Sequence, residues 1–203
     1  MGKQCPYLYD DVPVLKNLLG IKNSKELKKA EINRNRVILR VVYAKEYEEF
    51  NTETLCDIHR TIFSPLYEWA GEFRTVPVRK TEKALNGDTV CYAIPSDIEK
   101  QLARISDKIA KIQPSSSQSD TLREIVQIAA AIWCVHPFRE GNTRSVVAFS
   151  VLLAAKLGIE LDPTLFARRS TDVRNALVLC SQDSHSRYHD LERIYLDAAR
   201  LSK

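Results

Sequence analysis

The chain has 203 residues, of which 44% are hydrophobic and 28% are charged, and its formal net charge is +4. This length and apolar content predict one domain with a sizeable core, and no stretch approaches the roughly 20 apolar residues that a membrane span needs. The five cysteines are widely scattered without a Cys-x-x-Cys pair, which indicates neither a disulfide framework nor a zinc site.

The first 23 residues are expected to form an N-terminal arm, followed by a single helical domain over residues 24–203. Residues 1–10 lack the charged and apolar regions of a secretory signal. A cytoplasmic protein is therefore predicted. Export to another cell by a dedicated secretion system would leave no mark in this sequence.

Amphipathic helices are predicted over residues 24–44 and 52–63. The first is rich in Lys and Arg, a feature of some nucleic-acid-binding helices, but it also has a predicted apolar face. Its cations are therefore expected on a solvated outer face, and nucleic acid is not an expected partner. The residues of the predicted apolar face are Leu27, Ala30, Val37, Val41 and Ala44.

Residues 74–95 contain the one convincing β-like stretch. Two short runs rich in Val and Thr flank Asn86-Gly87-Asp88, a strong turn signal that predicts a hairpin. Pro77 restricts its strand to an edge because proline has no N–H for a ladder. Near the tip, the cations Arg79, Lys80 and Lys83 either meet an acidic partner or are solvated.

Four further helices are predicted over residues 97–112, 121–133, 145–157 and 187–201. The Pro-Ser-rich residues 113–119 form a loop between the first two. The second and third are apolar nearly all round, so they are expected to be buried. The predicted fold class is mainly all-α: a helical bundle with a small β-hairpin flap.

The two buried helices flank the densest polar cluster of the chain, residues 136–144. Pro137 cannot continue a helix and disfavours helical geometry at His136. The turn at 141–144 leads into a helix, whose first N–H groups and dipole suit an anion such as phosphate. Arg144 adds a cation, Glu140 is a ligand suited to Mg²⁺, and His136 can carry a proton.

Each of these residues also has an ordinary interpretation. A histidine after a helix is usually a cap, Glu-Gly-Asn is a common turn, and an arginine that begins a helix is usually solvated. Their joint occurrence between two buried helices favours a catalytic phosphate site at the loop 136–144.

This loop resembles the signature of Fic-domain proteins, His-x-Phe-x-Asp/Glu-Gly-Asn-Gly-Arg-x-x-Arg. Six of eight positions agree: His136, Phe138, Glu140, Gly141, Asn142 and Arg144. Residues 66–76 resemble the Tyr-Glu-Trp-Ala-Gly-x-x-Arg stretch of the same family, and residues 12–21 resemble its N-terminal Val-Leu-Lys-Asn-x-Leu-Gly-Ile. The resemblance covers most of the chain.

The resemblance implies a Fic-type helical bundle that transfers AMP from ATP to a Ser, Thr or Tyr hydroxyl of a target protein. It makes His136 the general base and Glu140 the Mg²⁺ ligand. It assigns the phosphate-binding role to the turn Gly141, Asn142, Thr143 and Arg144, with Arg144 steadying the leaving pyrophosphate.

The resemblance also implies that the hairpin is a flap over the active site that registers the target segment by strand addition. Its candidate contact residues are Val76, Val78, Val90 and Tyr92. Tyr188 on the last predicted helix, with Val90 or Tyr92, is a candidate wall for the adenine.

The chain departs from the family pattern at two positions. Thr143 replaces a glycine, and in the related Doc branch a lysine at that position accompanies phosphorylation. Val147 replaces an arginine that contacts the γ-phosphate, so weaker nucleotide selectivity is expected. The alternatives are therefore Doc-like phosphotransfer, transfer of another nucleotide moiety, and a catalytically weak Fic domain that acts as a binding module.

Many Fic proteins carry an inhibitory helix with the pattern Ser/Thr-x-x-x-Glu-Gly/Asn. Residues 24–31 and 186–192 have the wrong spacing. Restraint is expected to come from a separate small antitoxin-like protein, or not to be needed. Structural or surface roles are expected for His59, His185 and His189.

Overall fold

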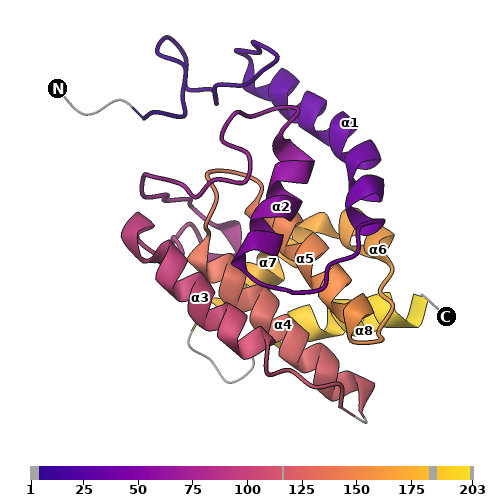
Figure 1. Ribbon diagram of the computed structural model, residues 1–203. Helices are drawn as coiled ribbons and strands as arrows, with labels where there is room; N and C mark the ends of the chain where they lie inside the picture. The colour runs from indigo at the N-terminus through magenta and orange to yellow at the C-terminus, as the bar shows by residue number, and fades with distance from the viewer. Residues whose placement is uncertain (1–4, 116, 183–186, 202–203) are drawn as a thin grey trace.

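The computed structural model describes residues 5–115, 117–182 and 187–201. Within these residues the chain is mainly helical (Figure 1) and has no β-sheet, which confirms the predicted fold class. The elements are α1 Ser24–Tyr43, α2 Thr52–Phe63, η1 Lys83–Leu85, η2 Pro95–Asp97, α3 Ile98–Ile109, α4 Gln118–Val135, α5 Asn142–Lys156, α6 Pro163–Arg168, α7 Ser170–Cys180 and α8 His189–Leu201. No helix in the described part of the chain is long and apolar enough to cross a membrane.

Side-chain caps explain where several helices begin. Asn23 accepts hydrogen bonds from two backbone N–H groups of α1, and Asn51 does the same for α2. Ser117 caps α4 through one such bond. These caps satisfy N–H groups that have no partner within the helix. The predicted starts at residues 24 and 52 are confirmed.

The core is built around α4 and α5, which pack extensively against each other. α4 also contacts α3, α7 and α8, while α5 also contacts α1, α2 and α6. Trp133 of α4 and Phe149 of α5 are among the largest fully buried side chains. The loop 136–144 therefore connects two helices that are each packed against several others.

Two helices were not predicted, α6 and α7. α6 is short and begins with Asp162 as its cap and Pro163 in its first turn. α7 follows at once without a side-chain cap, so the usual start signal is missing.

The predicted structural or surface role of His185 falls outside the described residues.

The predicted apolar face of α1 is confirmed at Leu27 and wrong in the second half of the helix, where Val37, Val41 and Ala44 are exposed. Val37 is 69% exposed and Val41 is 49% exposed, whereas Leu27, Asn35 and Val42 are buried. The helix is rotated so that polar groups, including a glutamate described below, face α2 and α5. The inward positions Glu31, Asn35, Ile38 and Val42 follow helical spacing, but two of the four are polar, so the pattern of apolar residues does not reveal this face.

The predicted hairpin strands are absent from the described residues. One antiparallel bridge joins Thr81 to Thr89. The turn between them is present, with positive φ of 54° at Asn86 and 96° at Gly87. Pro77 removes one ladder donor, and a carbonyl on each arm accepts from a buried arginine instead of from an N–H of the opposite arm. Residues 74–95 are therefore called the flap below.

The N-terminal segment lies against the end of α2. The ring of Tyr7 packs edge-on against Trp69, with 5.6 Å between centroids. Leu18 donates its N–H to the carbonyl of Leu66 at 2.9 Å, and the Tyr7 hydroxyl accepts the N–H of Thr75 at 3.0 Å. These contacts anchor the segment to the stretch that leads into the flap.

Candidate active site

His136 ends α4 in a left-handed backbone conformation, with φ 53° and ψ 57°. Its N–H still donates to the carbonyl of Ile132 at 3.2 Å, so it acts as the C-cap of the helix. A positive φ is uncommon for a residue other than glycine, and such strain concentrates at functional sites. This conformation turns the chain sharply before Pro137 and fixes the position from which the His136 side chain extends.

The amide of Asn142 closes the loop. Its Nδ2 donates to the carbonyl of Phe138 at 2.7 Å, and its Oδ1 accepts the N–H of Phe138 at 3.0 Å. Phe138 itself is fully buried. The Asn142 amide is thus bonded within the loop. These two bonds alone explain an asparagine at this position, without any contact to a phosphate.

Gly141 is required by its surroundings. Its φ is 83°, and a Cβ at this position would lie 2.3 Å from the ring of Phe63 in α2. Both the backbone conformation and the lack of space demand glycine. The turn into α5 can therefore lie directly on α2.

The imidazole of His136 is buried among aromatic rings. Tyr92 stacks on it with 4.0 Å between centroids, and Trp133 meets it edge-on at 5.4 Å. Burial lowers the pKa of His136 well below its usual value, and the nearby ammonium of Lys80 lowers it further. The imidazole is therefore neutral at physiological pH.

The tautomer of His136 follows from its one hydrogen bond. Nδ1 lies 3.4 Å from the carbonyl oxygen of Trp133, and a carbonyl can only accept. Nδ1 thus carries the hydrogen and Nε2 presents a lone pair. Nε2 is buried without a hydrogen-bond partner, so the side chain is in the form that a general base needs.

The carboxylate of Glu140 lies just before α5, where two cations and a backbone N–H surround it. Oε1 accepts the N–H of Gly141 at 3.0 Å, Oε2 lies 3.3 Å from Nζ of Lys80, and Arg144 is 4.0 Å away. Partial burial raises the pKa of Glu140, but Lys80, the Gly141 N–H and Arg144 outweigh this and lower it to about 2. The side chain of Glu140 is therefore an ionised carboxylate at any physiological pH.

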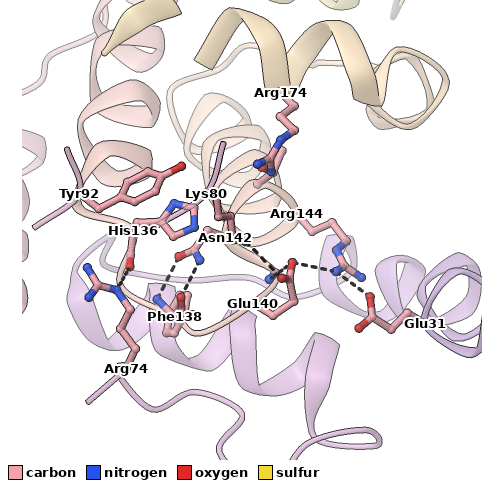
Figure 2. Close-up of polar contacts among 12 residues, drawn as sticks. Glu31, Arg74, Lys80, Tyr92, His136, Phe138, Glu140, Asn142, Arg144 and Arg174 are labelled. Carbon is pink, nitrogen blue, oxygen red and sulfur yellow. Dashed lines mark hydrogen bonds and ion pairs between the residues drawn. The ribbon is translucent and has the colours of Figure 1, made fainter. Parts of the chain in front are cut away.

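Arg144 is held by a glutamate from another helix. Its guanidinium donates to Oε2 of Glu31 in α1 at 3.0 Å and lies over the ring of Phe63, 4.6 Å from its centroid. Glu31 also accepts a hydrogen bond from the hydroxyl of Tyr67. Figure 2 shows Glu31 and Glu140 on two sides of Arg144. The cation predicted to meet a phosphate is thus already paired.

The flap covers the loop. Lys80 of the flap reaches Glu140, and Tyr92 of the flap lies against His136, as Figure 2 shows. Lys80 therefore has an acidic partner, but within its own chain. His136 is only 1% exposed, so a large substrate cannot reach its Nε2 unless the flap moves.

A buried ion pair fastens the flap to α7. Arg174 donates to Oε1 of Glu82 at 2.6 Å and to Oε2 at 3.3 Å, and the Tyr92 hydroxyl donates to the same carboxylate at 3.3 Å. Glu82 is buried, whereas Arg174 is about one third exposed. The pair joins the tip of the flap to a helix that the sequence did not predict.

Arg74 is a site residue whose role the sequence did not reveal. It is only 2% exposed, and its guanidinium donates to backbone carbonyls alone: His136 at 2.7 Å, Val76 at 3.0 Å, Val135 at 3.4 Å and Ala93. One side chain thus joins the end of α4 to both arms of the flap. Its place at the end of the Tyr-Glu-Trp-Ala-Gly-x-x-Arg stretch was the available signal.

His59 also supports the loop 136–144. It is fully buried in α2, where Nδ1 accepts the N–H of Gly71 at 2.8 Å and Nε2 donates to the carbonyl of Glu140 at 3.0 Å. Its ring stacks on Phe138, with 3.8 Å between centroids. Burial lowers the pKa of His59 to about 3. The predicted structural role is confirmed: His59 supports the loop from below.

The other predicted site residues lie at different depths. Val90 is buried, while Val76 and Val78 on the opposite arm are half-buried. Val147 is buried in α5. Tyr188 precedes α8, and the guanidinium of Arg187 lies 4.8 Å from its ring centroid. The proposed adenine contact of Tyr188 stays a prediction.

Residues 49–154, about half of the chain, match the Fic/DOC family. The chain therefore belongs to this family. The match spans the structure from the residues before α2 to the last turns of α5, and it includes the flap and the loop 136–144.

Two curated relatives are similar over most of this chain. The protein adenylyltransferase of Bartonella henselae is 27% identical over 199 residues, which cover 93% of this chain and 37% of that protein. The probable protein adenylyltransferase y4lH of Sinorhizobium fredii is 29% identical over 160 residues, which cover 77% of this chain and 79% of that protein. The chain thus spans little more than a third of the Bartonella protein.

The fold is also similar to solved structures. The crystal structure of BepC, a VirB-translocated effector protein of Bartonella tribocorum with bound AMPPNP, matches with a TM-score of 0.80 and 22% sequence identity. The match covers 95% of each chain. The arrangement of helices is therefore that of a Fic domain.

Proposed function

We propose that this chain is a protein adenylyltransferase, which transfers AMP from ATP to a Ser, Thr or Tyr hydroxyl of a target protein. One observation carries the proposal: the unprotonated Nε2 of His136 shares a nine-residue loop with an ionised carboxylate and the first turn of a helix. A base, a metal ligand and an anion-binding turn are the parts that nucleotidyl transfer to a hydroxyl needs. The adenylyltransferase names of the two curated relatives support it.

In this proposal His136 acts on the target. Its Nε2 takes the proton of the target hydroxyl as the oxygen attacks the α-phosphorus of ATP. The bond from that phosphorus to the oxygen bridging the α- and β-phosphates breaks, and pyrophosphate leaves. His136 is suited to this step because it is neutral and its Nδ1 is fixed on the carbonyl of Trp133.

The first turn of α5 and Arg144 would hold the phosphates. The N–H groups of Asn142 and Thr143 open the helix, where an N–H has no intrahelical acceptor. The N–H of Gly141 is already donated to Glu140. Arg144 would exchange Glu31 for a phosphate oxygen. The BepC structure, with its bound AMPPNP, supports a nucleotide as the ligand of this fold.

Glu140 is the residue that would hold Mg²⁺. It offers an ionised carboxylate beside the anion-binding turn, and the described residues contain no cluster of three or more His, Cys, Asp or Glu side chains that would make a complete metal cage. One carboxylate completed by phosphate oxygens and water is a usual Mg²⁺ environment. The bound ion would neutralise charge on the phosphates, and Lys80 would have to release Glu140.

The flap would admit the target. Because Tyr92 covers His136, the target segment has to displace that ring or enter beside it. An added strand would pair with flap backbone groups other than the Val76 and Ala93 carbonyls, which Arg74 already holds. Cytoplasmic synthesis, later export and a separate inhibitory protein stay predictions, and the BepC effector is compatible with export.

The test is transfer of label from ATP labelled at the α-phosphate, with Mg²⁺ and a cell lysate. The parent protein should label a target, and His136→Ala should not. His189→Ala is the matched control, because His189 is an exposed histidine on α8. Full labelling by His136→Ala would contradict the proposal. Binding of a partner without any labelling would favour the alternative of a catalytically weak binding module.

A further inference from the structure

Thr143 stands where the Fic signature has glycine, and its side chain makes a specific contact. The indole Nε1 of Trp133 lies 3.0 Å from Oγ1 of Thr143. Trp133 is fully buried on α4, whereas Thr143 is partly exposed in the first turn of α5. The contact therefore links the core to the surface of the anion-binding turn.

The direction of this hydrogen bond is settled by chemistry. An indole N–H can only donate, so the hydroxyl of Thr143 is the acceptor. The hydroxyl hydrogen is then left for another acceptor. Within the described part of the chain, no acceptor is bonded to it. Trp133 thus fixes the oxygen and leaves one donor uncommitted.

The same indole also touches the candidate base. Trp133 meets the ring of His136 edge-on, with 5.4 Å between centroids and an interplanar angle of 88°. His136 Nε2 is buried without a partner. One rigid ring therefore contacts both the imidazole with the free lone pair and the threonine with the free donor. The free donor of Thr143 needs an acceptor such as a phosphate oxygen, whereas the free lone pair of His136 needs a donor such as the target hydroxyl.

We propose that the Thr143 hydroxyl is a phosphate-binding donor of this chain and that Trp133 is the positioning residue that aims it. This inference rests on the proposed function, because it takes the nucleotide as the ligand of the turn. The hydroxyl donates to a phosphate oxygen while it accepts from the indole. A glycine at this position offers only its backbone N–H.

The inference gives a physical reason for both departures from the family pattern. Val147 removes a cation from the phosphate site, and Thr143 adds a neutral donor one turn earlier. A neutral hydroxyl does not select for the extra charge of a γ-phosphate as an arginine does. The expected ligand class is therefore nucleoside polyphosphates with little preference between ATP and ADP.

The test is calorimetric binding of ADP with Mg²⁺ to the parent, Thr143→Ser, Thr143→Val and Trp133→Phe, with further variants as controls. Valine keeps the branched shape but has no hydroxyl, and phenylalanine keeps the ring but has no N–H. Thr143→Val should bind ADP about tenfold more weakly than the parent, as expected for loss of one hydrogen bond to a charged group. Thr143→Ser should have a Kd for ADP within about twofold of that of the parent. Thr171→Val, at an exposed threonine of α7, is the control and should have the Kd of the parent.

The aiming role is tested by coupling. Trp133→Phe should weaken ADP binding several-fold, and the double variant with Thr143→Val should be no weaker than Thr143→Val alone, because both changes act through one hydroxyl. Additive losses would overturn the role of Trp133. Thermal unfolding of each variant checks that the fold is kept.

Other outcomes separate this inference from the proposed function. If the parent binds ADP and Thr143→Val binds it equally well, the inference is wrong and the proposed function stands. If Thr143→Gly binds ADP more tightly than the parent, the threonine only obstructs the turn, and the inference is again wrong. A parent protein that binds neither ADP nor ATP would overturn both.

Discussion

Replacing Glu31 with glutamine should strengthen nucleotide binding. Glu31 pairs with Arg144 at 3.0 Å, so a phosphate that uses Arg144 has to break this ion pair first. Glutamine has nearly the same shape and still accepts the hydrogen bond from Tyr67, but it has no charge. The substitution therefore removes the competitor of the phosphate and leaves the packing of α1 intact.

The magnitude follows from the exposure of the pair. A hydrogen bond between charged groups contributes about 1.5 to 3 kcal/mol when it is shielded. The side chain of Glu31 is 12% exposed, but that of Arg144 is 28% exposed, so solvent screens part of the interaction and the lower end applies. A difference of about 1.4 kcal/mol corresponds to a tenfold lower Kd for ADP.

The assay is calorimetric titration of the parent and Glu31→Gln with ADP and Mg²⁺. Glu26→Gln is the control, because Glu26 is an exposed glutamate on the same helix and should leave the Kd unchanged. An unchanged Kd for Glu31→Gln would refute the competition between Glu31 and phosphate. A higher Kd would show that Glu31 holds Arg144 in the position that binds nucleotide.

Three more predictions test the architecture around the site. Gly141→Ala should lower the free energy of unfolding in urea by about 2 to 5 kcal/mol, because its φ is positive and its Cβ would meet the ring of Phe63. Gly87→Ala, whose Cβ would meet no atom within 4 Å, should cost less. An equal cost for the two variants would contradict the packing argument. The folded pKa of His59 is about 3, below the unfolded value of 6.5, so the unfolded state binds more protons in between and stability falls as pH drops from 6.5 towards 3. Between about pH 6 and about pH 5 the parent should lose about 1.2 kcal/mol more than His59→Gln, and equal losses in urea unfolding would refute this assignment. Arg174→Ala leaves Glu82 buried without its cation, so a protease should cut the flap faster than in the parent while the Tm changes little. Arg174→Lys keeps a cation and should be cut as slowly as the parent. Slow cleavage of both variants would show that the ion pair does not hold the flap.

The parts of the fold that depend on local signals could be predicted. The helices at 24–43 and 52–63 are predicted as amphipathic segments and begin where Asn23 and Asn51 cap them, and α4 and α5 follow from their apolar composition. The loop 136–144 was identified because Pro137 interrupts two buried helices. In each case the determining residues are close together in the sequence.

The parts that depend on distant partners could not be predicted. Glu31 and Arg144 are more than one hundred positions apart, and nothing in the helical pattern of α1 indicates that a glutamate faces inward. The arms of the flap have the composition of strands, but Arg74 takes the carbonyls that a ladder would use. Asn142 has a family role at the phosphate, yet its amide bonds to Phe138 show a structural task that its residue type alone does not reveal.

The central claim is transfer of the AMP moiety by the loop that carries His136. The most direct measurement uses ATP with one isotope at the α-phosphate and a second isotope at the γ-phosphate, and determines the ratio of the two in the labelled target. The account predicts the α-isotope alone, with no label in the reaction of His136→Ala. The γ-isotope alone would show Doc-like phosphotransfer and would contradict the account.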